Sequence, residues 1–457
     1  MKSVPKIKFL SLAMLVSCAQ LDAADWLMLQ GSERETVVVE GVSVPYSNKT
    51  PKLWGFIQVN YKQDRGDEQI SPTGVNQTPF SLLNPDLEDQ SGFNVFRARV
   101  ALRGMADDEN LVNYFFMTEF GNSGVNNLAG HREVATYFTD ASVTLKHVPY
   151  AKLRVGMFKT PGSEEGLQAV FVSPYIEFTT MTNQQLLERQ VTEVGAAQTG
   201  AEAGGAQTVH YTSTTVDQPI AAFRDTGAQI FDTVPLTDTW SVSYAYMYGN
   251  GTGISRDASN NQETHYGYLA LEDNFNDKRG YYHESMKFYG WMQEGERILL
   301  SSTDGKIDAN RQRYGVGMTY YYNGLRFEAE YMKAKGMIYV GAKDTDTDPS
   351  NEDWQFQYAI GDENRADGGY VNLQYEIVPK KFELFGRYDI MDRLPDDEKA
   401  RRKFKTATFG CSYRFKGATR IDFNYAFRDA EAPGSTNAQT VLDNMGDRIS
   451  VQLTAAF

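Results

Sequence analysis

The chain ends on a strand-like segment whose last residue is aromatic, and this feature limits the folds that are open to it. In RISVQLTAAF (residues 448–457), Ile449, Val451, Leu453 and Phe457 share one parity, and polar residues occupy most of the other. Side chains alternate between the two faces of a strand, so this segment has one apolar face and one polar face. An apolar face that reaches the last residue is expected of the closing strand of a barrel in lipid, and would be accidental in a soluble sandwich.

The first residues predict export. Lys2, Lys6 and Lys8 precede an apolar run over residues 9–19, and a small-residue cleavage site follows at Ala23. This pattern predicts a signal peptide over residues 1–23, because the run is too short for a membrane helix. The stretch that ends at Cys18 also resembles a lipoprotein cleavage box, so the sequence leaves open whether Cys18 is removed or lipidated.

Charge and cysteine content exclude several functions. Cleavage would remove three Lys and one Asp, which takes the formal net charge from −14 to −16 and argues against nucleic acid as a partner. Cys411 would then be the single cysteine, so no disulfide framework, cysteine-based metal site or other cofactor is expected. We predict no enzyme, because no histidine lies in a Gly-x-Ser-x-Gly or metal-ligand context; the five are His131, His147, His210, His265 and His283.

Segments of about ten residues with alternating polarity recur along the chain, and each has the length of a tilted membrane strand. They number sixteen: 54–61, 93–104, 112–121, 134–146, 151–159, 226–232, 240–249, 263–272, 285–295, 312–322, 325–334, 369–377, 381–391, 404–415, 418–427 and 447–457. The chain also holds 27 Tyr and 26 Phe, as expected of aromatic girdles at the membrane surfaces. We therefore predict an all-β protein, a sixteen-stranded antiparallel transmembrane β-barrel over residues 51–457.

The connections between these segments support the prediction. Seven short connections alternate with eight longer ones, as expected for short periplasmic turns and long extracellular loops in a bacterial outer membrane. The longest connection, 160–225, follows the fifth strand and could narrow a pore. Residues 24–50 precede the barrel, and the sequence does not decide between a periplasmic plug and an extra strand.

Parity assigns charged side chains to the lumen, because charge on the lipid face near the midplane costs roughly 2–4 kcal/mol. Nine arginines and eight acids are expected inside: Arg97, Arg99, Arg103, Arg154, Arg326, Arg387, Arg414, Arg420 and Arg448, with Glu119, Asp140, Glu328, Glu330, Glu376, Glu383, Asp389 and Asp422. Phe96, Ala98, Val100 and Leu102 are expected to face lipid. The near-neutral count favours charge pairing across the wall, and the alternative is a track of arginines that guides anions.

Several motifs resemble those of the phosphate-selective porin O and P family. They are FRARVAL, YFFMTEFG, LRVGMFKTP, YIEF, LLERQ, RDTGAQI, YMYGNGTG, LRFEAEYM and FELFGRYDIMD, spread over nearly the whole barrel. The resemblance implies a sixteen-stranded trimer whose lumen is lined by arginines and narrowed by the third loop. It implies that Arg97 is the second of two pore arginines and that Glu119 faces them. Phe96 stands where the first arginine would be, which weakens the case for strong phosphate selectivity.

The resemblance also matches Lys159 to a pore lysine, although Met157 replaces a neighbouring glutamine. Lys159 shares the parity of Val155, so its side chain has two open directions, into the pore or out of the strand end. Acidic loops expected at 62–92 and 335–368 would repel anions at the mouth, an effect that salt screens beyond about 8–10 Å. Alternatively, these acids bind divalent cations or lipopolysaccharide.

The sequence therefore predicts an outer-membrane porin for passive diffusion of small anions or other small hydrophilic solutes. The expected anion-binding residues are Arg97, Arg99, Arg103, Glu119, Arg154, Lys159 and Arg387. The other expected neighbours are outer-membrane lipid, lipopolysaccharide and two further copies of the chain. Ion selectivity stays open, and the alternatives are a general or cation-preferring porin and an anchor or adhesin barrel.

Overall fold

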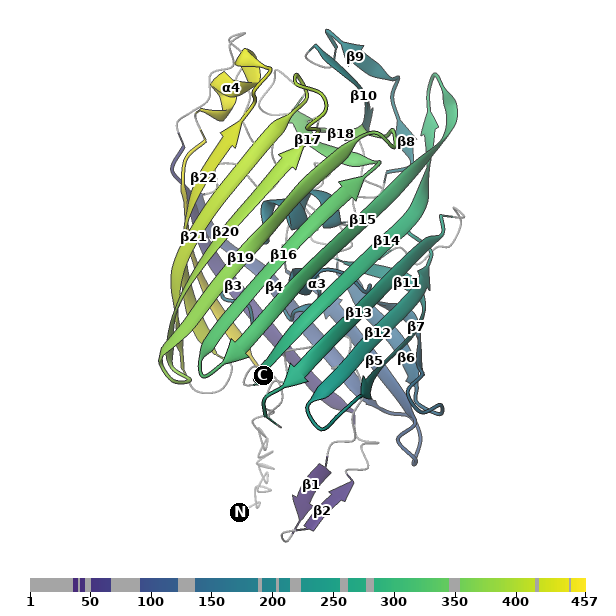
Figure 1. Cartoon of the computed structure of the whole chain (residues 1–457), viewed down its shortest axis with the longest axis vertical. Coiled ribbons are helices and arrows are strands. Elements are labelled where there is room, and N and C mark those ends of the chain that lie inside the picture. The colour runs from purple at the N-terminus through teal and green to yellow at the C-terminus, as the bar shows by residue number, and fades with distance from the viewer. Residues whose placement is uncertain are drawn as a thin grey trace, which may run out of the picture.

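The computed structural model describes residues 36–39, 42–45, 51–66, 91–121, 136–187, 191–202, 205–213, 223–254, 262–276, 283–344, 354–415, 419–443 and 445–457. Sixteen antiparallel strands form a closed barrel, as predicted (Figure 1). The expected signal peptide and Cys18 lie outside the described residues, as do residues 67–90 of the predicted loop 62–92 and residues 345–353 of the predicted loop 335–368. Within the described part of the chain, no helix combines the length and apolarity needed to cross a membrane.

The barrel strands follow one another around the wall in chain order. They are β3 (Lys52–Asp64), β4 (Ser91–Met105), β5 (Val112–Glu119), β6 (Tyr137–Leu145), β7 (Lys152–Lys159), β11 (Arg224–Pro235), β12 (Trp240–Gly249), β13 (Thr264–Asn274), β14 (Ser285–Ser301), β15 (Gly305–Tyr322), β16 (Leu325–Lys335), β19 (Arg365–Val378), β20 (Phe382–Arg393), β21 (Arg402–Arg414), β22 (Arg420–Glu431) and β23 (Arg448–Ala456). Each overlaps one of the sixteen predicted segments.

The last strand closes the barrel on the first. β23 pairs with β3 from Arg448 opposite Asp64 to Ala456 opposite Phe56. Phe457 continues the ladder, because its N–H and carbonyl exchange hydrogen bonds of 2.9 Å with Gly55. A closed barrel leaves no strand edge exposed, so every backbone group of the wall can pair within the membrane.

Short turns lie at one end of the barrel, which is the periplasmic end by the rule for bacterial barrels. The turn Asn323–Gly324 has positive φ at both residues, 48° and 79°, as a two-residue hairpin turn requires. At the other end the predicted loop 296–311 is wrong. β14 and β15 run on to Ser301 and Gly305 and leave only residues 302–304 between them. Both strands therefore extend beyond the membrane, where alternation of polarity is not required.

Inward and outward positions follow the predicted parity along most strands. β20 shows it plainly, since Glu383, Arg387 and Asp389 are buried while Leu384 and Tyr388 are about half exposed on the outer face. β3 is longer than predicted and includes Lys62 and Asp64, which were assigned to a loop. Both side chains are buried inside the barrel, and Asp64 pairs with Arg428 and Arg448.

The prediction that Phe96 faces lipid is wrong. The β3–β4 ladder passes from Gln58 opposite Arg97 to Val59 opposite Val95, so Phe96 is the extra residue of a β-bulge. A bulge shifts the alternation by one residue, and Phe96 and Arg97 are therefore both buried, while Val95 remains 50% exposed. Ala98, Val100 and Leu102 lie below the bulge and keep the expected outward parity.

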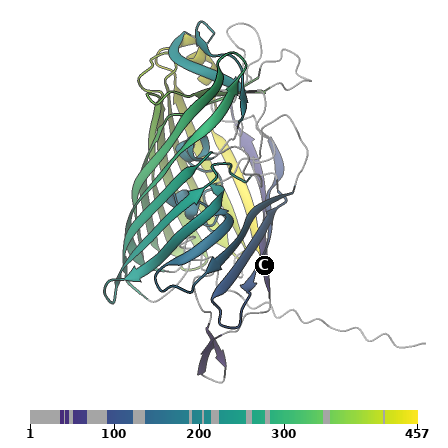
Figure 2. The same ribbon diagram turned by 90° about the vertical axis from the view of Figure 1, so that its right-hand side faces the viewer.

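Five short elements lie in the described part of the third loop. They are α3 (Glu164–Leu167), the single-turn π-helix η2 (Thr182–Leu186), β8 (Glu193–Val194), β9 (Gln198–Gly200) and β10 (Ala206–Ser213). α3 lies within the barrel in both views (Figures 1 and 2). β8 extends the wall by pairing with β14.

A four-stranded sheet joins the third loop to the loop between β16 and β19. It contains β9, β10, β17 (Ile338–Asp344) and β18 (Trp354–Ala359), in the order β17-β18-β10-β9. We call it the cap sheet, and Figure 1 shows it at the long-loop end of the barrel. Gln185 of η2 exchanges side-chain hydrogen bonds with the backbone of Tyr339 in β17, which attaches the cap sheet to the loop below it.

Two further pieces complete the described chain. The helix α4 (Thr436–Leu442) lies between β22 and β23. β1 (Thr36–Val39) and β2 (Val42–Pro45) pair antiparallel with each other and with no barrel strand among the described residues.

Candidate pore constriction

The first half of the third loop crosses the lumen and carries carboxylates to cations of the wall. Glu165 lies 2.9 Å from Nη1 of Arg387 on β20, and Glu164 lies 2.9 Å from Nζ of Lys287 on β14. Glu165 also accepts hydrogen bonds from the N–H and hydroxyl of Thr179, so the loop fixes the carboxylate from its own side. Both ion pairs are buried, and breaking one would leave an uncompensated charge in the barrel.

A third carboxylate attaches the loop to the seam of the barrel. Glu177 pairs with Lys62 of β3 and lies 3.9 Å from Nη1 of Arg448 on β23. Burial opposes ionisation of Glu177, but the positive charges of Lys62 and Arg448 outweigh it and lower the pKa of this carboxyl to about 2. Glu177 is therefore an anion at every pH at which the outer membrane normally works.

Backbone carbonyls of the loop accept further hydrogen bonds from the wall. Arg420 donates to the carbonyls of Val172 and Ser173. Asn424 donates to Pro174 at 3.0 Å, and Gln58 donates to Val170 at 3.2 Å. Arg387 of β20 donates to the carbonyl of Glu177 at 3.0 Å, so the loop segment 170–177 is held by β3, β20 and β22.

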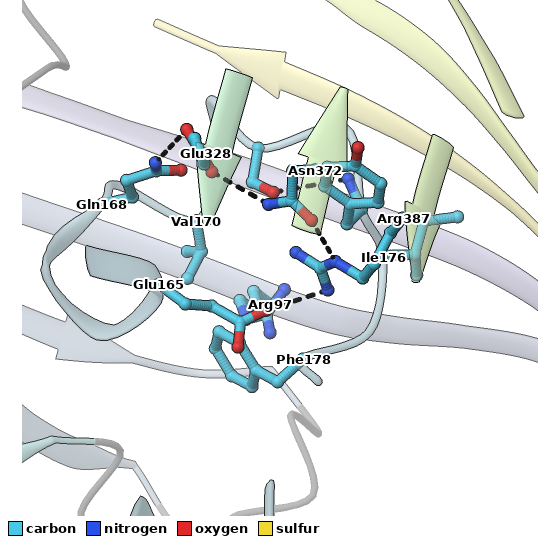
Figure 3. A pocket seen from close by; sticks show the side chains of 11 residues that line it. Arg97, Glu165, Gln168, Val170, Ile176, Phe178, Glu328, Asn372 and Arg387 are labelled. Carbon is cyan, nitrogen blue, oxygen red and sulfur yellow. Dashed lines mark hydrogen bonds and ion pairs between the residues drawn. The ribbon is translucent and has the colours of Figure 1, made fainter. Parts of the chain in front are cut away.

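A pocket lies where this loop meets the wall (Figure 3). It is lined by Arg97, Glu165, Gln168, Val170, Ser173, Tyr175, Ile176, Phe178, Glu328, Asn372 and Arg387. Two guanidinium groups and two carboxylates therefore share one small space. Glu328 accepts hydrogen bonds from Gln168 at 2.6 Å and Asn372 at 2.9 Å, and Arg387 donates to Asn372 at 2.8 Å.

Both guanidinium groups of the pocket lie over aromatic rings. Arg97 is 4.1 Å from the ring centre of Phe96 and 5.7 Å from that of Phe178, and it donates to Gln58 at 2.9 Å. Arg387 is 3.9 Å from the ring centre of Tyr175 and 5.6 Å from that of Tyr370. Stacking fixes the guanidinium plane and leaves the charge intact, so the pocket contains two oriented cations.

Arg99 and Glu119 form an ion pair between adjacent strands, whereas the family resemblance implied that Glu119 faces the position of Arg97. Nε of Arg99 lies 2.6 Å from Oε2 of Glu119, and the other carboxylate oxygen accepts from the N–H groups of Ala98 and Gly121. Arg103 sits nearer the short-turn end of β4, opposite Lys52, and is partly exposed. Arg99 and Arg103 do not line the pocket that contains Arg97.

Arg154 and Lys159 of β7 are buried, and neither lines the pocket. Arg154 donates to Thr144 and lies 4.6 Å from the ring centre of Phe231. Lys159 reaches inward, because Nζ donates to the loop carbonyls of Gly166 and Gln168 at 2.7 and 2.8 Å. The sequence had left the direction of Lys159 open, and the structure shows that it supports the loop.

Sequence reasoning missed the loop carboxylates and some of their partners. Glu164, Glu165 and Glu177 were not among the predicted residues, and neither were Lys62 and Lys287. Glu177 belongs to the YIEF motif that carries the family resemblance, so this motif was the available signal. The partners of the acids are distant in sequence and follow no local pattern.

Comparison with known families identifies the chain. A model of the phosphate-selective porin O and P family matches residues 77–457. The chain belongs to this family. The protein is an outer-membrane porin, located in the bacterial outer membrane, and it is a channel by family and by fold.

Three solved structures resemble the chain in overall fold at low sequence identity. The anion-selective porin from Comamonas acidovorans has a TM-score of 0.49 at 14% identity, covering 89% of this chain and 99% of that one. OmpT of Vibrio cholerae has a TM-score of 0.48 at 12% identity, covering 93% and 100%. Salmonella typhi OmpF has a TM-score of 0.48 at 13% identity, covering 90% and 98%. A search of curated proteins found no match, and the assignment rests on the family model.

Proposed function

We propose that this porin mediates passive diffusion of small hydrophilic solutes with a modest preference for anions. The observation that supports it is the pocket at the third loop, where Arg97 and Arg387 both present a guanidinium. A guanidinium stays charged and can bind an oxyanion through two parallel hydrogen bonds. Glu165 and Glu328 share the same pocket, so the preference is expected to be weak. The proposed role includes no enzymatic activity and no cofactor.

The experiment is single-channel recording in a planar bilayer with a salt gradient. Arg97→Gln should shift the reversal potential toward cations and lower the anion-to-cation permeability ratio about fivefold. One unit charge at about 8 Å in a water-like medium attracts an anion by roughly 0.5 kcal/mol and repels a cation by as much, and the difference of about 1 kcal/mol corresponds to this ratio. Arg103→Gln is the matched control, because Arg103 lies on the same strand outside the pocket. A wild-type channel that prefers cations at every ionic strength would contradict the proposal.

A general or cation-preferring porin is the second candidate. The observation that favours it is the string of buried acids in the third loop, since Glu164, Glu165 and Glu177 each pair with a cation of the wall. These acids cancel charges that an anion track would need. If this candidate is correct, Arg97→Gln and Arg103→Gln will change selectivity equally little.

We also propose a homotrimer, which is the assembly implied by the family resemblance. Cross-linking of the protein in outer membranes should give a ladder that ends at three copies. A ladder that ends at one copy would contradict this assembly and leave the channel proposal intact.

A further inference from the structure

Two of the four charges in the third-loop pocket cancel each other by direct contact. Glu165 lies 2.9 Å from Nη1 of Arg387, and its carboxylate also accepts a hydrogen bond of 2.7 Å from the hydroxyl of Thr179. Both side chains of this ion pair are more than nine-tenths buried. The pair therefore presents little net charge to a solute, and discrimination between solutes depends on the other two charged residues of the pocket, Arg97 and Glu328.

Glu328 is held by neutral groups. Its Oε1 accepts hydrogen bonds from the hydroxyl of Tyr321 at 2.5 Å and from Nε2 of Gln168 at 2.6 Å, and its Oε2 accepts one from Nδ2 of Asn372 at 2.9 Å. Glu328 is 3% exposed, and it forms no ion pair with any residue that the structure describes. A buried carboxylate without a contacting cation carries a desolvation cost, so this position favours a positively charged group of a solute.

Arg97 supplies the opposite charge from the far side of the barrel. β4 and β16, which carry Arg97 and Glu328, lie on nearly opposite sides of the ring of sixteen strands. The guanidinium of Arg97 lies over the rings of Phe96 and Phe178 and donates to Gln58 at 2.9 Å. These contacts orient the guanidinium and leave its charge intact, so the pocket has a positive end and a negative end.

Apolar side chains of the third loop lie between the two ends. Val170, Ile176 and Phe178 line the same pocket as Arg97 and Glu328. In Figure 3, Val170 lies between Glu328 and Arg97, and Phe178 lies beside Arg97. The pocket thus offers a carboxylate, an apolar surface and a guanidinium to the same solute.

We propose that the pocket selects small zwitterionic solutes, namely amino acids with an apolar side chain. The carboxylate of such a solute binds Arg97, and its ammonium replaces the Gln168 amide against Glu328. Its side chain contacts the apolar residues between the two ends. This inference rests on the proposed function, since it requires that solutes diffuse past the third-loop pocket, and it names the class of solute that the pocket suits.

Solutes with one kind of charge match the pocket less well. An inorganic oxyanion pairs with Arg97, is repelled by Glu328 and makes no use of the apolar residues between them. An organic cation pairs with Glu328 and is repelled by Arg97. An amino acid pairs with both ends at once, so its attraction to the pocket requires no net charge on the solute or on the pocket.

The test compares three solutes of one carbon skeleton as blockers of the full-length channel in a planar bilayer. Leucine carries both charges, isocaproate lacks the ammonium, and isoamylamine lacks the carboxylate. The measured quantity is the concentration of solute that halves the single-channel current in potassium chloride. For the wild type this concentration should be about threefold lower for leucine than for either of the others, because leucine makes one more ion contact.

Variants at the two ends of the pocket separate the two contacts. Glu328→Gln should raise the blocking concentration of leucine about threefold and should not raise that of isocaproate. Arg97→Gln should raise the values for leucine and isocaproate and should not raise that for isoamylamine. Glu376→Gln is the matched control, because it removes the same charge from β19 outside the pocket and should leave all three values as in the wild type.

Three results would overturn the inference. Equal blocking concentrations of leucine and isocaproate in the wild type would make the pocket a site for anions alone, and a stronger block by isoamylamine would make it a site for cations. An unchanged leucine value in Glu328→Gln would exclude Glu328 as the partner of the ammonium. The reversal potential in the same recordings tests the proposed anion preference separately, whereas the leucine measurements decide this inference. Heat-dependent mobility in dodecyl sulfate shows that each variant has folded.

Discussion

Glu177 of the third loop and Lys62 of β3 form an ion pair inside the barrel. β3 is the strand on which β23 closes, and Arg448 of β23 lies near the same carboxylate. The third loop is therefore attached to the seam of the barrel through the charge of Glu177.

The first prediction concerns the pH range of this attachment. The folded protein holds the pKa of Glu177 at about 2, below the 4.5 of a free glutamate. The pair therefore stabilises the loop fully above about pH 4.5, and this contribution is lost as the pH falls from 4.5 toward 2. The Glu177 pair should therefore add no pH dependence to channel conductance between pH 7 and about 4.5, so the wild type and Glu177→Gln should respond alike to pH in this range.

Glu177→Gln should uncouple the loop at neutral pH. The change leaves Lys62 and Arg448 without this counter-charge, so the reversal potential should move toward anions and current noise should rise. Glu202→Gln is the control, because Glu202 lies in the outer half of the same loop and is exposed. Identical recordings from Glu177→Gln and Glu202→Gln would show that the pair does not position the loop.

The second prediction concerns Phe96. The β-bulge turns Phe96 inward beside Arg97, at the position where the family resemblance implies an arginine. Phe96→Arg should therefore add a cation to the lumen, raise the anion-to-cation permeability ratio and strengthen the block of chloride current by phosphate. Phe96→Leu keeps the site apolar and should leave both quantities near their wild-type values. If Phe96→Arg changes neither quantity, the bulge does not direct this position into the conducting path.

Alternation of polarity was sufficient to predict the strands because lipid meets one face of each of them. β20 and β16 illustrate this over residues 383–390 and 325–331, where buried charged residues such as Arg387 and Glu330 alternate with outward apolar residues such as Tyr388 and Tyr331. The same rule failed over residues 296–311 of β14 and β15, where burial still alternates in β14 but the polarity of the residues does not follow it: Leu299 is buried and Leu300 is about half exposed.

The contacts between the third loop and the wall were harder to predict from the sequence than the strands of the wall. Arg97 and Arg387 were predicted from parity, and the structure places them in one pocket. The direction of Phe96 depends on the register between β3 and β4, which no single strand encodes. The pairing of Glu165 with Arg387 depends on the path of a long loop. The sequence around Arg387 therefore could not show that a loop carboxylate neutralises its charge.

The third prediction concerns His210 of β10, which is 5% exposed within the cap sheet. Burial and then Arg393 lower the pKa of His210 to about 4, while Asp397 opposes them and Arg402 adds to the lowering. A released cap would bind a proton near pH 6.5, so the attached state loses stability as the pH falls from about 6.5 toward 4, by up to roughly 3 kcal/mol. Hydrogen exchange of β10 and β18 should therefore accelerate between pH 7 and pH 5, after correction for the intrinsic pH dependence of exchange.

His210→Gln removes the titrating group and should abolish this acceleration. His265→Gln is the control, because His265 lies on the outer wall beside Tyr246. The prediction fails if His210→Gln and the wild type accelerate equally between the two pH values.

The fourth prediction tests the register of β21. Cys411 lies between Leu384 and Phe423, which are both about half exposed on the outer face of the wall. A membrane-impermeant thiol reagent should therefore label Cys411 slowly in folded protein embedded in lipid and quickly after unfolding. Asp308→Cys in a Cys411→Ser background places a thiol on the exposed hairpin of β14 and β15 and should label quickly in both states. Rapid labelling of Cys411 in the folded protein would mean that the strand is shifted by one residue.

The last prediction concerns Phe457 and the closure of the barrel. Its backbone exchanges two hydrogen bonds with Gly55, and its side chain is 60% exposed on the outside. The ring also lies against Gly55, where an added Cβ would come within 2.8 Å of it. Deletion of Phe457 removes both hydrogen bonds and the aromatic contact, so it should lower the amount of heat-modifiable protein in the outer membrane while export to the periplasm continues. Phe457→Tyr keeps the ladder and the ring and should assemble normally, whereas Phe457→Ala keeps the ladder alone and should fall between the two. Equal assembly of all four proteins would show that the aromatic side chain and the last rung of the ladder are both dispensable.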